Sequence, residues 1–120
     1  MSTYKELIVW KKSYSLVLLI YKITKKFPKD ESYGLTSQIR RASISLPSNI
    51  AEGSKRGTRK DFCQFLRVAQ GSGAELETQL LLAQDLNYIG NKEYSETNLL
   101  LNEIMKMLTG LINKLSTSNQ

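Results

Sequence analysis

The 120-residue sequence contains no histidine, one cysteine and two prolines. Without histidine, the chain lacks the commonest general base and metal ligand, and a di-iron bundle built on Glu-x-x-His pairs is excluded. The lone Cys63 cannot form an internal disulfide, which fits a reducing compartment. Its neighbours Phe62, Gln64 and Phe65 supply neither a base nor a metal ligand, so we expect a helix-packing residue rather than a nucleophile. These absences favour a non-enzymatic protein without metal or cofactor.

Long apolar runs and targeting signals are also absent. The longest apolar run, residues 16–21, is far shorter than the roughly 20 residues that cross a bilayer. The N-terminal apolar segment lacks a small-residue cleavage site. We therefore expect a cytoplasmic protein with no membrane partner. With 41% hydrophobic residues and seven glycines, one compact domain is expected over residues 1–120, in which residues 116–120 form a frayed tail.

Apolar residues recur every three or four positions along most of the sequence. This spacing predicts an all-α protein with helices over about residues 6–26, 33–53 (or as far as 56), 59–87 and 92–114. No strand pattern appears. Because the connections are short, we expect an antiparallel up-down left-handed four-helix bundle. Pro47 lies inside the second helix, where it removes a backbone donor, and it predicts a bend there.

The third predicted helix carries a heptad seam in which steps of four and three alternate. Its members are Phe62, Leu66, Ala69, Gly73, Leu76, Leu80 and Ala83. The tiny residues 71–74 either break the helix or allow a neighbouring helix to approach closely. Because the heptad phase continues across them, we favour a continuous helix next to residues 42–45. Thr58 is expected to cap its start, and Gly90 to follow its end.

A polar stripe runs beside the apolar face of the second helix. It consists of Gln38, Arg41, Ser45, Asn49 and Glu52, at three- and four-residue spacing. One interpretation is a solvated outer face. The other is a partly buried network shared with the third helix, whose members would be Arg41, Asn49, Glu52, Glu75 and Glu77. An enzyme built on Arg41, Glu52 and Glu75 is a much weaker hypothesis than a structural network.

Positive charge is concentrated in the first half of the chain. Residues 1–60 hold 13 of the 17 basic and four of the 11 acidic residues, a net charge of +9, whereas residues 61–120 carry −3. An up-down bundle places the start of the first helix at the same end as the turn between the second and third. The cations expected to gather there are Lys5, Lys11, Lys12, Lys55, Arg56, Arg59 and Lys60. We interpret them as a surface for RNA or DNA phosphates without sequence-specific readout. The alternative is charge that serves solubility or an acidic protein partner.

Three apolar residues of the first predicted helix fall outside its core-facing side. They are Ile8, Leu18 and Leu19, which lie among lysines. A helix in a monomeric bundle needs only one apolar face. We therefore expect these residues to help form the subunit interface of a homo-oligomer.

Short segments spread over residues 9–88 share their order and spacing with a known family. They are Val9-Trp10-Lys11, Ile20-Tyr21-Lys22-Ile23-Thr24, Phe27-Pro28, Tyr33-Gly34-Leu35, Gln38-Ile39-Arg40-Arg41-Ala42, Pro47-Ser48-Asn49-Ile50-Ala51-Glu52-Gly53, Gly71-Ser72 and Glu75-Leu76-Glu77-Thr78. They resemble the four-helix-bundle proteins encoded within intervening sequences of bacterial 23S ribosomal RNA genes, to which accessory proteins of diversity-generating retroelements are similar. The resemblance implies a bundle that assembles into a homo-oligomer, with five subunits as in the retroelement proteins. It also implies RNA and a reverse transcriptase as partners.

Overall fold

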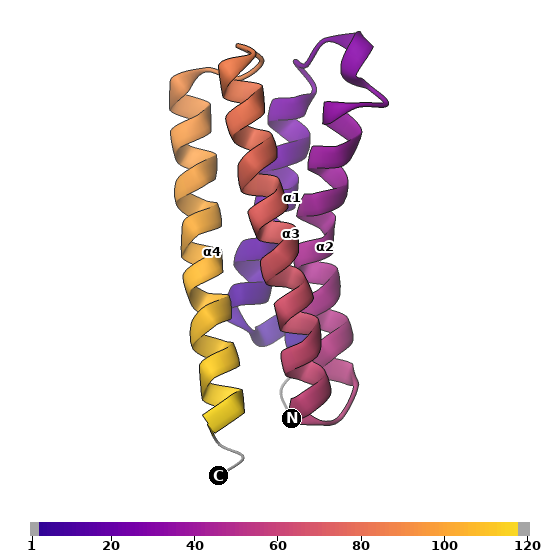
Figure 1. Cartoon of the computed structure of the whole chain (residues 1–120), viewed down its shortest axis with the longest axis vertical. Coiled ribbons are helices and arrows are strands. Elements are labelled where there is room, and N and C mark those ends of the chain that lie inside the picture. The colour runs from indigo at the N-terminus through magenta and orange to yellow at the C-terminus, as the bar shows by residue number, and fades with distance from the viewer. Residues whose placement is uncertain (1–2, 118–120) are drawn as a thin grey trace.

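Apolar residues at three- and four-residue spacing form four α-helices in the computed structural model, which describes residues 3–117. The helices are α1 (Ile8–Thr24), α2 (Leu35–Lys55), α3 (Arg59–Asp85) and α4 (Asn91–Thr117), and the short 3₁₀ helices η1 (Tyr4–Glu6) and η2 (Lys29–Glu31) precede α1 and α2. Among the described residues there is no strand. The four α-helices lie side by side in an elongated bundle (Figure 1). The prediction of an all-α four-helix bundle is confirmed.

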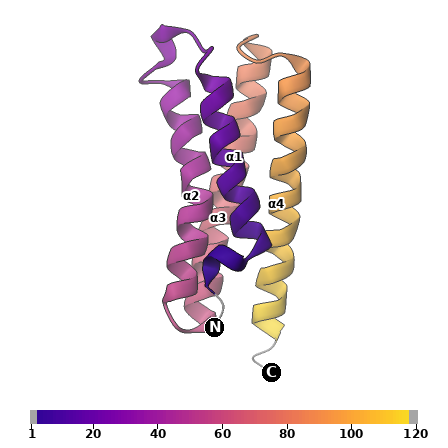
Figure 2. The ribbon, with the colours of Figure 1, turned by 180° about the vertical axis from the view of Figure 1, so that it is seen from behind.

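The connections between helices alternate between the two ends of the bundle. Figure 1 shows the start of the chain, the α2–α3 turn and the end of α4 at one end, and the α1–α2 and α3–α4 connections at the other. Each helix packs against the next and α4 packs against α1, so that α1 and α3 are diagonal to one another. Figure 2 shows α1 from the opposite side, with η1 at its start. Consecutive helices therefore run in opposite directions.

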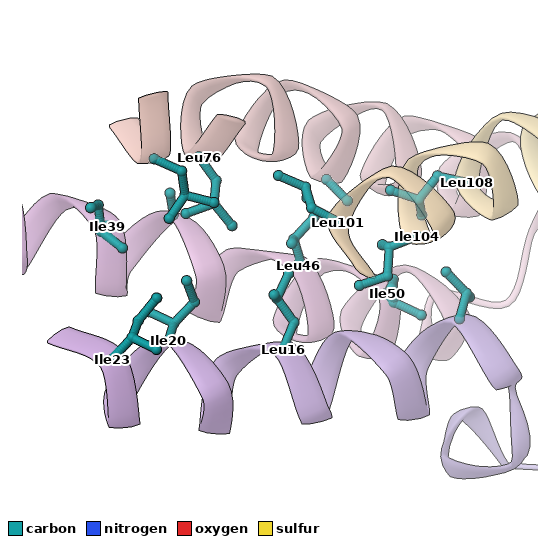
Figure 3. Packing of buried hydrophobic residues seen from close by; sticks show 14 of the residues in the cluster. Leu16, Ile20, Ile23, Ile39, Leu46, Ile50, Leu76, Leu101, Ile104 and Leu108 are labelled. Carbon is teal, nitrogen blue, oxygen red and sulfur yellow. The ribbon is translucent and has the colours of Figure 1, made fainter. Parts of the chain in front are cut away.

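The core consists of the seam residues of all four helices. Figure 3 shows its central layers, in which Leu16, Ile20, Ile39, Leu46, Ile50, Leu76, Leu101, Ile104 and Leu108 are fully buried. Six of the seven seam residues predicted for α3 are buried, and the seventh, Phe62, packs against the core. The seam is buried because heptad spacing keeps these side chains on one side of the helix.

Small residues in the middle of α3 allow α2 to approach on one side and α4 on the other. The helix continues through residues 71–74, as predicted. On one side, the Ser72 Oγ atom lies 2.8 Å from the Ser45 Oγ atom of α2. On the other, a Cβ atom at Gly73 would collide with the Met105 sulfur of α4. Glycine at position 73 therefore leaves room for the Met105 side chain.

Two helix boundaries differ from the predicted ones near the chain ends. Leu7 has extended backbone (φ −69°, ψ 129°) between η1 and α1, so that α1 begins at Ile8 rather than at Glu6. Ser116 and Thr117 belong to α4, which is longer than predicted. Residues 118–120 of the predicted tail lie outside the described residues. The helix α2 continues through Pro47, and the bend there and the left-handed twist of the bundle stay predictions.

The end of α3 is set by an asparagine and not by the predicted glycine. Asn87 has a positive φ of 63°, the Tyr88 amide donates to the Ala83 carbonyl at 2.8 Å, and the Asn87 amide donates to the Gln84 carbonyl at 2.9 Å. These bonds form a Schellman motif, and asparagine tolerates the left-handed conformation that it requires. Gly90 instead lies at the start of α4, where its carbonyl accepts from the Tyr94 amide.

Candidate nucleic-acid interface and neighbouring sites

The end of the bundle that contains the α2–α3 turn is called the basic end here, after its cations. Gly57, with φ +92°, lets the chain reverse direction, and the Thr58 hydroxyl accepts a hydrogen bond from the Asp61 amide at 3.1 Å, as predicted for a helix cap. This turn places Lys55 at the end of α2. Arg59 and Lys60 lie in the first turn of α3. All three are exposed.

The structure does not bring all of the predicted phosphate-binding cations together. Lys11 and Lys12 lie on α1, which is diagonal to α3, and the Lys12 ammonium lies 3.2 Å from the Glu103 carboxylate of α4. The Arg56 guanidinium lies 3.2 Å from the Glu52 carboxylate and 4.9 Å from the centre of the Phe65 ring. The charges of Lys12 and Arg56 are therefore partly neutralised by acidic neighbours.

A cleft of about 310 Å³ opens between α3 and α4 at the basic end. It is called the basic cleft, and its lining residues are Lys60, Cys63, Gln64, Arg67 and Ser116. Two cations, one amide and one hydroxyl can all donate hydrogen bonds to an anion, and within residues 3–117 no acidic residue lines the cleft. Lys60, Gln64 and Arg67 share one stripe because they are spaced by four and three residues. The buried Cys63 thiol lies 3.7 Å from the Ser116 hydroxyl.

Arg67 and Ser116 were not among the predicted site residues. Arg67 lies about two helical turns after Lys60 in α3, outside the cluster of basic residues at positions 55–60 of the sequence. Ser116 belongs to the segment predicted as a frayed tail, and its position in the final turn of α4 brings it next to α3. A spacing of four and three from Lys60 is the signal that could have identified Gln64 and Arg67.

The opposite end, which contains the α1–α2 and α3–α4 connections, is called the latch end. Here the Glu31 carboxylate accepts from the Leu35 amide and from the Tyr88 hydroxyl, each at 3.0 Å. The Lys26 ammonium donates to Glu93 at 2.9 Å. The hydrogen bond to Glu31 raises the pKa of Tyr88, and the hydrogen bond from Lys26 lowers the pKa of Glu93. Charged groups at the latch end thus connect helices to one another.

The predicted buried network of Arg41, Asn49, Glu52, Glu75 and Glu77 is wrong in its burial and its pairing. The Arg41 side chain and all three glutamates are exposed, and Asn49 is half-buried. Glu52 pairs with Arg56, and the Asn49 amide donates to Ser45. Between α2 and α3, the small residues Ser45 and Ser72 are in direct contact and bring the two helices close together. Long side chains therefore remain outside.

Arg40, next to Arg41 in the sequence, makes the interhelical contact. Its Nε atom donates to the Thr24 hydroxyl at 2.9 Å, and its guanidinium lies 4.4 Å from the centre of the Tyr21 ring. Arg41 instead lines a second cleft, between α2 and α3. This polar cleft has a volume of about 310 Å³ and is lined by Gln38, Arg41, Ala42, Ser45, Ser72 and Glu75.

Both α1 and α4 carry exposed apolar side chains. Ile8, Leu18 and Leu99 are 60%, 59% and 73% exposed. A groove of about 470 Å³ lies between the start of α1 and the second half of α4, lined by Glu6, Leu7, Ile8, Val9, Met107, Gly110, Leu111 and Lys114. Leu19, predicted to lie at a subunit interface, is half-buried and packs against the bundle core. Of the three predicted residues, Ile8 and Leu18 are available to a second subunit.

No helix within residues 3–117 is long and apolar enough to cross a membrane. In the same part of the chain, no group of three or more cysteine and acidic side chains is placed to hold a metal ion.

Comparison with known proteins gives two findings. Residues 5–110 match the model of the 23S rRNA-intervening sequence protein family. The chain is also similar to the crystal structure of a protein with unknown function from the S23 ribosomal protein family of Bacteroides thetaiotaomicron. The two are 29% identical with a TM-score of 0.79, over 88% of this chain and 98% of that one. A comparison with curated proteins gave no match.

Proposed function

The chain belongs to the 23S rRNA-intervening sequence protein family, and we propose that it is a non-enzymatic, homo-oligomeric accessory protein that binds RNA or DNA through its basic end. The observation that carries this proposal is the basic cleft, which Lys60 and Arg67 line together with the Ser116 hydroxyl, and to which no acidic residue of the described part of the chain contributes. Cations with hydroxyl and amide donors are the groups that proteins use to contact phosphates. Lys55, exposed at the end of α2, extends this surface toward the turn.

The position of Arg59 and Lys60 supports the same conclusion. Both lie in the first turn of α3, where the helix dipole favours acidic groups and disfavours cations, by roughly 0.3–1 kcal/mol for each charge. The same turn carries one acidic residue, Asp61, so that cations outnumber acidic groups where the dipole favours the reverse. A bound phosphate interacts favourably both with the cations and with the helix dipole.

Binding of this kind contacts the phosphate backbone and does not read sequence. The cations lie on exposed helix surface, and the sequence contains no nucleic-acid recognition motif. An oligomer would repeat the basic end in every subunit, and linked weak sites raise the effective concentration of one another. From the family resemblance, we propose that the oligomer is a pentamer and that a reverse transcriptase is a partner.

The proposal predicts salt-sensitive binding to structured RNA, single strands or duplex DNA. In fluorescence anisotropy, each phosphate that a variant no longer neutralises on a single strand reduces the slope of log affinity against log salt by about 0.7. The triple variant Lys55→Gln, Lys60→Gln, Arg67→Gln should therefore reduce it by about 2, with about 100-fold weaker binding at roughly 0.1 M salt. The matched control Lys25→Gln, Lys29→Gln, Lys92→Gln removes three exposed cations from the latch end and should bind like the wild type. Absence of salt-sensitive binding by the wild type to all three probes would refute the proposal.

The alternative function is a protein–protein scaffold, and the exposed apolar side chains of α1 and α4 are the observation that favours it. Ile8 and Leu18 would lie in a subunit contact under either function. Light scattering should show an oligomer at micromolar concentration, and Ile8→Asp with Leu18→Asp should dissociate it. Tyr33→Asp, at a fully exposed position outside α1 and α4, serves as the control. A monomeric wild-type protein would refute the oligomer.

A further inference from the structure

The polar cleft between α2 and α3 lies outside the basic end. Ser45 and Ser72 are near the middle of their helices, and ten residues of helix, about 15 Å, separate Ser45 from Lys55. The lining contains one cation, one anion, one amide, two hydroxyls and Ala42 as the single apolar side chain. This composition differs from that of the basic cleft, whose described lining has two cations and no anion.

The hydrogen bond between the two serine hydroxyls of the polar cleft uses one of their two protons and leaves the other available. The Asn49 Nδ2 atom donates to the Ser45 Oγ atom at 2.7 Å, and Ser45 Oγ lies 2.8 Å from Ser72 Oγ. If Ser45 donates to Ser72, the Ser72 proton remains; if Ser72 donates to Ser45, the Ser45 proton remains. In either arrangement one hydroxyl can donate to an acceptor in the cleft, and the bond from Asn49 polarises the chain.

Arg41 and Glu75 contribute opposite charges to the same cleft without an ion pair between them. Among the described residues, neither side chain is within 4.0 Å of an oppositely charged group. Arg40 and Glu52, by contrast, have partners inside the chain. Arg41 therefore offers a fork of donors that fits a carboxylate. Glu75 offers an acceptor for a cation.

We propose that the polar cleft binds a small zwitterion of the free α-amino acid class. The ligand carboxylate accepts hydrogen bonds from Arg41 and from the serine pair, and its ammonium group donates to Glu75. The cleft carries no net formal charge, so it does not favour a phosphate over a neutral ligand. Its lining, as far as the structure describes it, has no aromatic side chain on which a nucleobase could stack, and stacking is the main contact that proteins make with unpaired bases.

The test is a titration of the ¹⁵N-labelled full-length protein followed by NMR, at constant pH and ionic strength. Glycine and serine should shift amide signals of residues 38–45 and 72–75 saturably. Glycine betaine has the same charges without N–H donors, and acetate lacks the cation. Both should bind at least tenfold more weakly. Guanosine is the probe for a nucleobase and should leave these signals unchanged.

Variants locate the binding and separate it from general charge effects. Arg41→Gln and Glu75→Gln should each weaken glycine binding at least tenfold, and Ser72→Ala severalfold. The matched controls are Lys106→Gln and Glu77→Gln, which remove exposed charges outside the cleft and should leave glycine binding unchanged. The proposal is overturned if glycine and serine give no saturable shift, if betaine binds equally well, if guanosine produces the same shifts, or if the controls weaken binding as much as the cleft variants. The result of this test does not depend on whether the basic end binds nucleic acid.

Discussion

The latch end and the basic end of the bundle contain similar kinds of charged residue but use them differently. At the latch end, Glu31 and Lys26 each contact a group from a distant part of the chain. At the basic end, the α2–α3 contact depends on close packing, because a Cβ atom on Gly53 would lie 2.7 Å from the Phe65 Cβ atom. Lys60 and Arg67 line a cleft there, and none of the acidic residues that the structure describes joins them.

This difference separates charge that stabilises the fold from charge that is available to a ligand. Removing a partner at the latch end leaves a hydrogen-bonding group unsatisfied. Removing a cation at the basic end leaves the packing of Gly53 unchanged. The basic end should therefore tolerate the loss of a cation but not an added side chain at Gly53, whereas the latch end should be sensitive to the loss of the Glu31 and Lys26 contacts.

The largest effect is expected when the packing of the basic end is changed. Gly53→Ala places a methyl group against Phe65 and Phe62 and should lower the free energy of unfolding by about 1–3 kcal/mol, measured by urea denaturation. The control Gly71→Ala is at an exposed position in α3 with no atom within 4 Å of the added carbon. It should raise the free energy of unfolding by roughly 0.5–1 kcal/mol. Equal effects of the two variants would contradict the packing argument.

The next effect concerns the hydrogen bonds of the latch end. Glu31→Ala removes the acceptor for the Leu35 amide and the Tyr88 hydroxyl, and should lower the free energy of unfolding by about 1–2 kcal/mol. Tyr88→Phe keeps the ring next to Phe27 and should cost about 0.5–1.5 kcal/mol. Because both variants break the same bond, the double variant should cost less than their sum. Strict additivity would show that the two residues act separately.

A charge reversal at the basic end should raise stability while it weakens ligand binding. Lys60→Glu places an acidic group in the first turn of α3 and should raise the free energy of unfolding by about 0.3–1 kcal/mol. The same variant should weaken nucleic-acid binding because it puts a negative charge in the basic cleft. Lys92→Glu makes the same change in the first turn of α4 and should stabilise without affecting binding. Loss of stability in Lys60→Glu would contradict the dipole argument.

The smallest effect is the pH dependence at Glu93. Its folded-state pKa lies below the ordinary value because of the hydrogen bond from Lys26. Its stabilising contribution is therefore present above the unfolded-state pKa and is lost as the pH falls through the folded-state pKa. Because the two side chains are 66% and 33% exposed, Lys26→Gln should cost only a few tenths of a kcal/mol at neutral pH. This difference from wild type should disappear in acid; a constant difference would exclude the linkage.

The helices and their core faces could be predicted from the sequence because burial is periodic. Leu66, Leu76 and Leu80 are buried for the reason their spacing indicates, and the same phase predicts the continuity of α3 through its glycines. The end of α3 could not be located in this way. Asparagine and glycine both accept a positive φ, and the sequence offers Asn87 and Gly90 three residues apart.

The partners of long side chains could not be predicted, because they depend on how neighbouring helices are rotated and shifted. Arg40 and Arg41 differ by one position, yet Arg40 contacts α1 and Arg41 lines the polar cleft. The polar stripe that contains Arg41 has the same sequence pattern whether it is a solvated face or a buried network. Its exposure follows from the contact between Ser45 and Ser72. Arg67 joins the candidate nucleic-acid site only because α4 brings Ser116 next to α3.

The two carboxylate oxygens of Glu31 link the start of α2 to the connection between α3 and α4. One holds the Leu35 amide at the start of α2, and the other holds the Tyr88 hydroxyl between α3 and α4. The amide proton of Leu35 exchanges with solvent only when its bond to Glu31 opens, and a carboxylate held by Tyr88 is less free to turn away. Hydrogen exchange at this single amide therefore reports on the opening of a contact between residues 57 positions apart.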